Sequence, residues 1–206
     1  MPLLIVLLVS VLLTGCQTTP EDYRNRLSQS HVCCTSVHQL HSNPTALDEI
    51  YHFKIGSGSQ IETLTIEGQK TFSKKIKLPL YEQPYSIKVM SSAGTSSAFV
   101  PRIATLDNDH KVIRVFDQED FRFNRNGYSG SIFVNEEDKD ETYLLIITDR
   151  EPENMPKFTQ VHIQTASLGN GSSINWATGD QTTQYKYSLG GTVSLHFQSY
   201  NRLNKD

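Results

Sequence analysis

Reactive side chains are densest in one short stretch that carries two adjacent cysteines and three histidines, namely His31, Cys33, Cys34, His38 and His41. One alternative for them is a vicinal disulfide, although neighbouring Cα atoms lie about 3.8 Å apart, below the usual disulfide range. The others are free thiols or disulfides to another chain, and a metal site that combines thiolates with imidazoles. The spacing matches no established zinc pattern, which favours the vicinal disulfide.

A second group of candidate residues surrounds the single tryptophan. Residues 166–183 are rich in Gly, Ser, Asn and Thr, which predicts a long functional loop. Flat aromatic faces beside polar groups could bind a sugar, and the alternative is that the aromatic residues belong to the core or to a hairpin. The candidate ligand-binding residues are Trp176, Tyr185, Tyr187, Asn175 and Asp180. Arg122, Arg125 and Tyr128 form a weaker cluster.

The sequence contains no recognisable catalytic constellation. Residues 127–130 are Gly-Tyr-Ser-Gly, which misses the second glycine of a G-x-S-x-G nucleophile elbow by one position. His52, His162 and His196 fall on the polar phase of alternating segments, as exposed strand histidines do. We therefore predict a protein that is not an enzyme and has no catalytic residues, no cofactor and no metal.

Length and charge narrow the class of protein. The chain has 206 residues, of which 19 are basic and 22 acidic, and its formal net charge is -3. Because no basic excess is available to displace counterions, we expect no nucleic-acid partner. Hydrophobic residues make up 37% and charged residues 20% of the chain, which favours a folded domain over a disordered chain.

The N-terminus predicts a targeting segment. Residues 1–15 are apolar and uncharged, and as a helix they would span about 22 Å, less than a hydrocarbon core of about 30 Å. This length indicates a signal peptide. The sequence LTGC at residues 13–16 resembles the bacterial lipobox, which implies acyl chains on Cys16 that anchor the protein in a membrane. Gln17 after this cysteine implies the inner leaflet of the outer membrane, facing the periplasm.

The remaining chain divides into a tether, a body and a tail. Residues 16–47 begin with a polar segment and contain the cysteine pair, which predicts a flexible tether, and residues 201–206 are a polar tail. Apolar and polar residues alternate with a period of two over residues 48–200, which predicts antiparallel strands. Helices are expected at most at residues 19–28 and 45–51. The fold class is all-β, a single antiparallel β-sandwich or jelly-roll-like domain.

Individual strands can be assigned within this body. The alternation is clearest at residues 51–55, 75–78, 85–89, 161–165 and 193–197. An unbroken apolar run at residues 143–147 predicts a central strand that is buried on both faces. The sequence Asp-Asn-Asp at residues 107–109 predicts a hairpin that joins residues 103–106 to residues 112–116.

Several of these segments together resemble the maltose operon periplasmic protein family (MalM). They are FVPRIATLD at residues 99–107, IRVF at 113–116, DFRF at 120–123, YLLIITD at 143–149 and GTVSL at 191–195. The resemblance covers about residues 50–198 and implies a periplasmic accessory of maltose and maltodextrin transport without catalytic residues. The chain departs from the family in its lipobox and its shorter C-terminus.

These observations lead to two functional hypotheses. The first is a lipoprotein that assists carbohydrate transport by binding a maltodextrin or a transport component. The second is an adaptor of the cell envelope that binds another envelope protein rather than sugar, and the cysteine pair and the predicted tether motivate it.

Overall fold

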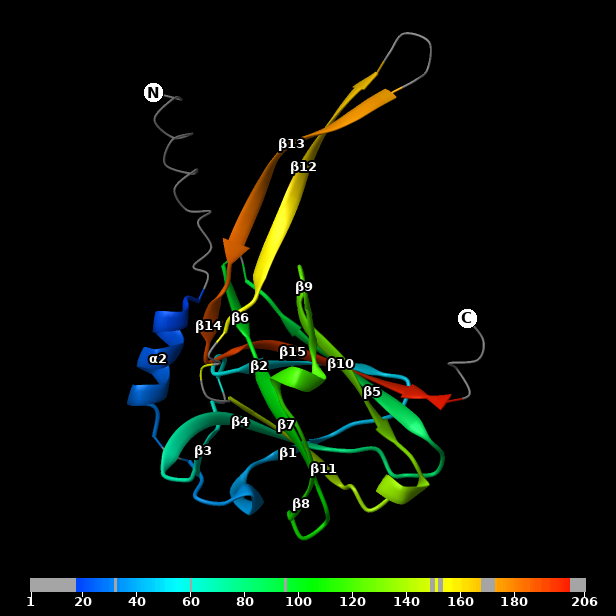
Figure 1. The fold of residues 1–206 in the computed structure, drawn as a ribbon. Helices are drawn as coiled ribbons and strands as arrows, with labels where there is room; N and C mark the ends of the chain where they lie inside the picture. Colours follow the sequence, from blue (N-terminus) through cyan, green and yellow to red (C-terminus); the bar gives the residue numbers. More distant parts are fainter. Residues whose placement is uncertain are drawn as a thin grey trace, which may run out of the picture.

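The fold is a β-sandwich with a long two-stranded arm, as the computed structural model shows (Figure 1). The structure describes residues 18–31, 33–59, 61–94, 96–148, 151, 154–167 and 173–200. Cys16 and residues 201–206 lie outside this part of the chain. The predicted all-β sandwich is confirmed.

One layer is a six-stranded sheet and the other a five-stranded sheet. The first has the order β1 (Ser42–Pro44), β4 (Gln69–Lys77), β11 (Tyr143–Thr148), β7 (Pro101–Leu106) and β8 (Val112–Phe116), with β3 (Thr63–Ile66) paired to β4. The second has the order β2 (Ile50–Ile55), β15 (Gly191–Ser199), β5 (Tyr85–Ser92), β10 (Gly127–Val134) and β9 (Arg122–Asn124). All these pairs are antiparallel except β1 with β4.

Smaller elements complete the molecule. The arm consists of β12 (Lys157–Ser167) and β13 (Ser173–Gln184), and β6 (Ser97–Phe99) pairs with β14 (Lys186–Ser188) in parallel. The α-helix α2 (Pro20–Gln29) lies beside the sandwich, with 3₁₀ helices η2 (Val37–Gln39), η3 (Gln118–Asp120) and η4 (Glu136–Asp138). Within the described residues, no helix is both long and apolar enough to span a bilayer.

The main hydrophobic core lies between the two sheets. Fully buried side chains from both layers meet there, and they include Phe72, Ile76, Ile87, Ile132, Leu195 and Phe197. The strands that the alternation predicts are present as β2, β4, β5, β12 and β15. Burying apolar side chains contributes about 25 cal/mol for each Å² removed from water, so this interface is the main stabilising feature of the fold.

Strand β11 is buried on both faces, as its unbroken apolar run predicts. Leu144 and Ile146 point into the main core, whereas Leu145 and Ile147 belong to a second cluster on the outer face of the six-stranded sheet. The predicted hairpin is also present, because β7 and β8 pair in antiparallel orientation across the turn at residues 107–111.

The predicted loop at residues 166–183 is wrong for residues 166–167 and 173–183, which lie in strands, whereas residues 168–172 lie outside the described structure. Residues 173–184 form β13, which pairs with β12 over the length of the arm and is interrupted by an irregularity next to His162. A two-stranded ribbon has no buried face of its own, so its sequence can be rich in polar residues and still form strands. The short helix expected at residues 45–51 is also wrong, because Ile50 already begins β2.

The short helix expected at residues 19–28 is present as α2, so the predicted flexible tether is wrong for residues 20–29. A capping box begins this helix, because Thr19 Oγ1 accepts a hydrogen bond from Asp22 N and Asp22 Oδ2 accepts one from Thr19 N. Tyr23 fixes the helix to the main core, where its ring meets Phe72 edge-on at 6.5 Å between centroids. A β-carbon at Gly190 would lie 2.5 Å from the Tyr23 ring, so a glycine there makes room for it. The folded domain therefore begins well before residue 48.

Replacing the helix anchor tests this correction. Tyr23→Ala should lower the free energy of unfolding by about 2–4 kcal/mol, because it empties a buried aromatic site. Arg24→Ala, whose side chain is 48% exposed and makes only surface ion pairs, should cost about 1 kcal/mol or less. Urea denaturation measures both changes. If residues 20–29 were a flexible tether, neither variant would change the free energy of unfolding.

Candidate functional site

The two adjacent cysteines form a disulfide with each other. Cys33 is exposed, whereas Cys34 is buried and makes an isolated parallel bridge with Leu64 of β3. Of the three alternatives that the sequence leaves open, the structure contains the vicinal disulfide. The buried half of the disulfide therefore packs on the outer face of the six-stranded sheet.

Residues 33–41, which we call the N-terminal clasp, cover this outer face. Cys34, Val37 and Leu40 of the clasp pack against the second hydrophobic cluster, to which β11 contributes Leu145. The 3₁₀ helix η2 begins at a cap formed by Ser36, whose hydroxyl accepts a hydrogen bond from His38 N. The clasp is thus part of the folded domain.

A buried lysine holds the clasp in place. Lys75 of β4 is 3% exposed, and its Nζ donates to the carbonyl oxygens of Val37 at 2.9 Å and His38 at 3.4 Å. The same ammonium lies 3.1 Å from His110 Nε2 and 5.3 Å from the centroid of the Tyr143 ring. Because a charged lysine has only donors, His110 Nε2 must be the acceptor, and His110 is neutral in this arrangement.

Two histidine rings and one tyrosine ring stack beside this lysine. The His110 ring lies 4.6 Å from Tyr143 and 4.1 Å from His38, centroid to centroid. Burial lowers the pKa of His110, and the positive charges of Lys75 and His38 lower it further. Burial also lowers the pKa of Lys75.

The predicted metal alternative does not assemble here. The structure places His38 beside His110 rather than beside His31 and His41. No cluster of three or more His, Cys, Asp or Glu side chains suited to a metal occurs in the described part of the chain. The sequence pattern does not single out Lys75 or His110. The alternation places Lys75 on a solvated face. His110 follows the Asp-Asn-Asp turn, and only the folded structure brings it close to Lys75 and Tyr143.

Acidification should weaken the clasp. Because the native pKa of His110 is below its unfolded value of about 6.5, the unfolded chain binds the proton more readily below that pH. This histidine therefore makes the free energy of unfolding fall as the pH drops below about 7.5. His110→Asn, which accepts the positive φ of 62° at this position, should lose less stability over the same pH range in urea titrations.

The exposed His41 provides a matched control for this experiment. His41→Asn removes an imidazole that takes no part in the cluster and should keep the pH dependence of the original chain. Equal pH dependence of all three proteins would contradict the role given to His110.

The predicted ligand-binding cluster is corrected at two residues. Tyr185 and Tyr187 are buried in the main core, where Tyr185 meets the Phe123 ring at 5.0 Å, so neither ring offers a face to a sugar. Trp176, Asn175 and Asp180 lie in β13, but their side chains are outside the described structure. In the weaker cluster Tyr128 is also buried, whereas Arg122 and Arg125 are exposed.

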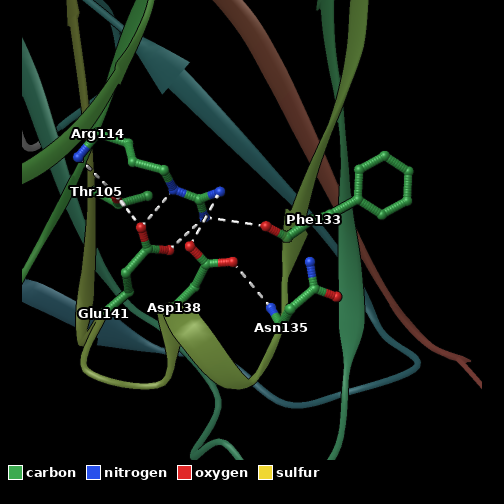
Figure 2. A network of polar contacts seen from close by, with 6 residues as sticks. All are labelled: Thr105, Arg114, Phe133, Asn135, Asp138 and Glu141. Atoms are coloured by element: carbon green, nitrogen blue, oxygen red, sulfur yellow. Dashed lines mark hydrogen bonds and ion pairs between the residues drawn. The ribbon is translucent and has the colours of Figure 1, made fainter.

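A polar network connects the two sheets near the start of β11 (Figure 2). Arg114 of β8 donates from Nε to Glu141 Oε1 at 2.6 Å and from Nη2 to Oε2 at 2.7 Å. It also reaches the carbonyl oxygen of Phe133 at 3.0 Å and Asp138 Oδ1 at 3.4 Å. Thr105 donates to Glu141 Oε1 at 2.6 Å. The network thus joins β8 and β7 of one sheet to β10 of the other.

The network has a structural role, because its charges are satisfied by each other. The Glu141 side chain is 0% exposed and the Arg114 side chain 30% exposed. Burial lowers the pKa of Arg114, but hydrogen bonds and the negative charge of Glu141 outweigh this effect and raise the pKa overall. Both carboxylate oxygens of Glu141 accept hydrogen bonds from Arg114, so the two charges compensate each other.

Removing the buried charge should be costly. Glu141→Gln leaves Arg114 without its carboxylate and should lower the free energy of unfolding by about 3 kcal/mol, the lower end for a broken buried pair because Arg114 is partly exposed. Glu136→Gln removes an exposed carboxylate paired to Lys139 and should cost about 1 kcal/mol or less. Urea denaturation at neutral pH compares the two, and similar losses would rule out the proposed importance of the pair.

A cavity of about 390 Å³ lies between α2 and the ends of β4 and β11. Lys70 and Arg102 line it together with apolar side chains such as Leu27 and Ile147. The Lys70 ammonium donates to the carbonyl oxygens of Ser28 and Ser30, so it stabilises the C-terminal end of α2. The charge of Lys70 therefore has a structural explanation.

Comparisons with known proteins add little to this description. No family model and no curated protein matches the chain. A solved structure that resembles it is the pre-peptidase C-terminal domain of collagenase from Bacillus anthracis, with 10% sequence identity and a TM-score of 0.31. The match covers 77% of this chain and 95% of that domain. This TM-score is too low to assign a function, and the resemblance to the maltose operon family stays a prediction.

Proposed function

We propose that the protein is a non-enzymatic adaptor of the bacterial envelope that binds another envelope protein through its β12–β13 arm. The observation that carries this proposal is the arm itself, in which two strands of 11 and 12 residues form a sheet of their own. Figure 1 shows the arm, in yellow and orange, projecting from the sandwich.

The backbone of the arm is suited to binding an extended segment. In a two-stranded sheet each strand is an edge, with one row of N–H and C=O groups that the ribbon itself leaves unpaired. A partner can add a strand to such an edge, so that main-chain hydrogen bonds provide much of the affinity. Exposed edges of this length pair non-specifically with other chains unless something covers or blocks them. A protein partner that pairs with the edge would cover it, which supports a protein-binding role.

The proposal includes the lipid anchor and the periplasmic location that the lipobox implies. Acyl chains on Cys16 would hold the domain close to the inner leaflet of the outer membrane, because α2 begins at Pro20, shortly after this cysteine. Such an adaptor agrees with an accessory role in maltodextrin transport in which the partner is a transport component. Direct sugar binding has less support, since Tyr185 and Tyr187 are buried.

Shortening the arm tests the proposal. Joining Thr159 to Thr182 through an Asn-Gly turn keeps the three pairs at the base of the arm and the contact between Tyr185 N and Pro156 O. The sandwich should keep its thermal midpoint within about 3 °C, because β12 and β13 pair with each other and form a sheet separate from the two layers. Crosslinking in the native envelope should then lose the adduct that the original chain forms.

Two results would contradict the adaptor function. The first is an unchanged adduct with the shortened arm. The second is heat released by maltoheptaose in calorimetry that disappears with the shortened arm, which would favour the sugar-binding alternative. A Cys16→Ser variant, which should move the protein to the soluble fraction, tests the anchor separately.

A further inference from the structure

The outer face of the five-stranded sheet carries exposed cations. None of its five strands contains an aspartate or a glutamate, and the same holds for the six strands of the other sheet. The five strands instead place cations on this face: Lys54 on β2, Lys88 on β5 and Arg122 on β9, all exposed. His52 and His196 also lie on the outward phase of their strands.

These cations are unpaired, whereas several others in the protein are not. Lys54, Lys88 and Arg122 make no ion pair within the described residues. By contrast, Lys74 pairs with Glu62 at 3.0 Å and Arg114 pairs with Glu141. The positive potential of this face is therefore not neutralised by neighbouring carboxylates of its own strands.

Exposed apolar side chains lie among the cations. Ile50 is 56% exposed, Phe133 55% and Met90 38%, and all three are on the outward phase of their strands. The six-stranded sheet has its outer face covered by the N-terminal clasp, but no described element of this chain covers the outer face of the five-stranded sheet. Arginine, methionine and phenylalanine are residue types that protein interfaces favour.

A hollow of about 320 Å³ lies in the cationic part of this face. Its floor is β10, where Ser129 and Ser131 have short side chains. Lys88 is the register partner of Ser131 on one side, and Arg122 is the register partner of Ser129 on the other. Asp120 lies at the rim, and its carboxylate accepts a hydrogen bond from Asp117 N at 3.0 Å. A carboxylate placed in the hollow would have a cation on each side and hydroxyl donors beneath it.

We propose that this face docks an acidic, partly apolar segment of a partner protein. Carboxylates of the segment lie against Lys54, Lys88 and Arg122, and its apolar side chains cover Ile50, Met90 and Phe133. The apolar side chains favour a protein over a polyanionic glycan, which would leave them uncovered. The inference rests on the proposed adaptor function, since both require a protein partner, but it concerns a different surface from the arm.

The test uses an acidic copolymer of glutamate and tyrosine as the probe, and fluorescence anisotropy measures its affinity for the whole protein. Charge reversal by Lys54→Glu, Lys88→Glu and Arg122→Glu should weaken binding at least about tenfold, and raising NaCl from about 50 to about 300 mM should weaken binding to the original chain. Phe133→Ser should weaken binding of the copolymer more than binding of polyglutamate.

A matched control reverses three exposed cations elsewhere, Lys77→Glu, Lys111→Glu and Lys186→Glu, and so changes the net charge equally. It should change the affinity by less than about twofold, because these residues lie off the face. Equal weakening by both triple variants would overturn the proposal, since net charge alone would then explain it. Tighter binding of heparin, or of vesicles of phosphatidylglycerol and phosphatidylethanolamine, would overturn the choice of a protein partner.

The proposals for the arm and for the docking face can be tested separately. The shortened arm should bind the copolymer as well as the original chain does, because the face is intact. If charge reversal leaves copolymer binding unchanged while arm shortening abolishes the envelope adduct, this inference is wrong and the adaptor function stands. If arm shortening leaves the adduct unchanged while charge reversal abolishes copolymer binding, the arm proposal is wrong and the acidic docking face stands.

Discussion

The burial of β11 on both faces is the constraint on which the rest of the structure depends. Its side chains alternate between the main core and the second cluster, with Leu144 and Ile146 on one side and Leu145 and Ile147 on the other. A strand of this kind requires a cover on each face of its sheet. The five-stranded sheet covers one face, and the N-terminal clasp covers the other. The clasp is therefore a necessary part of the domain and cannot be a tether.

Covering the second face also determines which polar groups become buried. Lys75 lies on the phase of β4 that faces the clasp, so its ammonium loses water and takes the carbonyl oxygens of Val37 and His38 instead. Where the chain crosses from β10 to β11, Glu141 is buried, and Arg114 compensates its charge. Both arrangements stabilise the fold only while every partner is present, since an uncompensated buried charge costs more than the intact arrangement contributes.

The sequence predicted the sandwich well because period-two alternation reports directly on burial at one face of a sheet. A short helix was expected at residues 19–28, but Tyr23 is its single buried residue in an otherwise polar segment, so no apolar stripe showed that α2 packs on the domain. The arm needs no buried face, and its polar composition is typical of a loop as well. For the candidate sites, the disulfide was foreseeable from adjacency, whereas the approach of Lys75 to His110 depends on the register of β4 against the folded clasp.

The unpaired cations on the five-stranded sheet follow from a different balance. An exposed ion pair contributes only about 0–1 kcal/mol, so leaving Lys54, Lys88 and Arg122 without carboxylates costs the fold little. The same charges act strongly on association, because a surface of one sign attracts an oppositely charged partner and excludes a like-charged one. Exposed cations without carboxylate partners therefore have little consequence for folding and a large one for binding. The arm presents backbone edges and this face presents charge, so the two surfaces would select a partner by different properties.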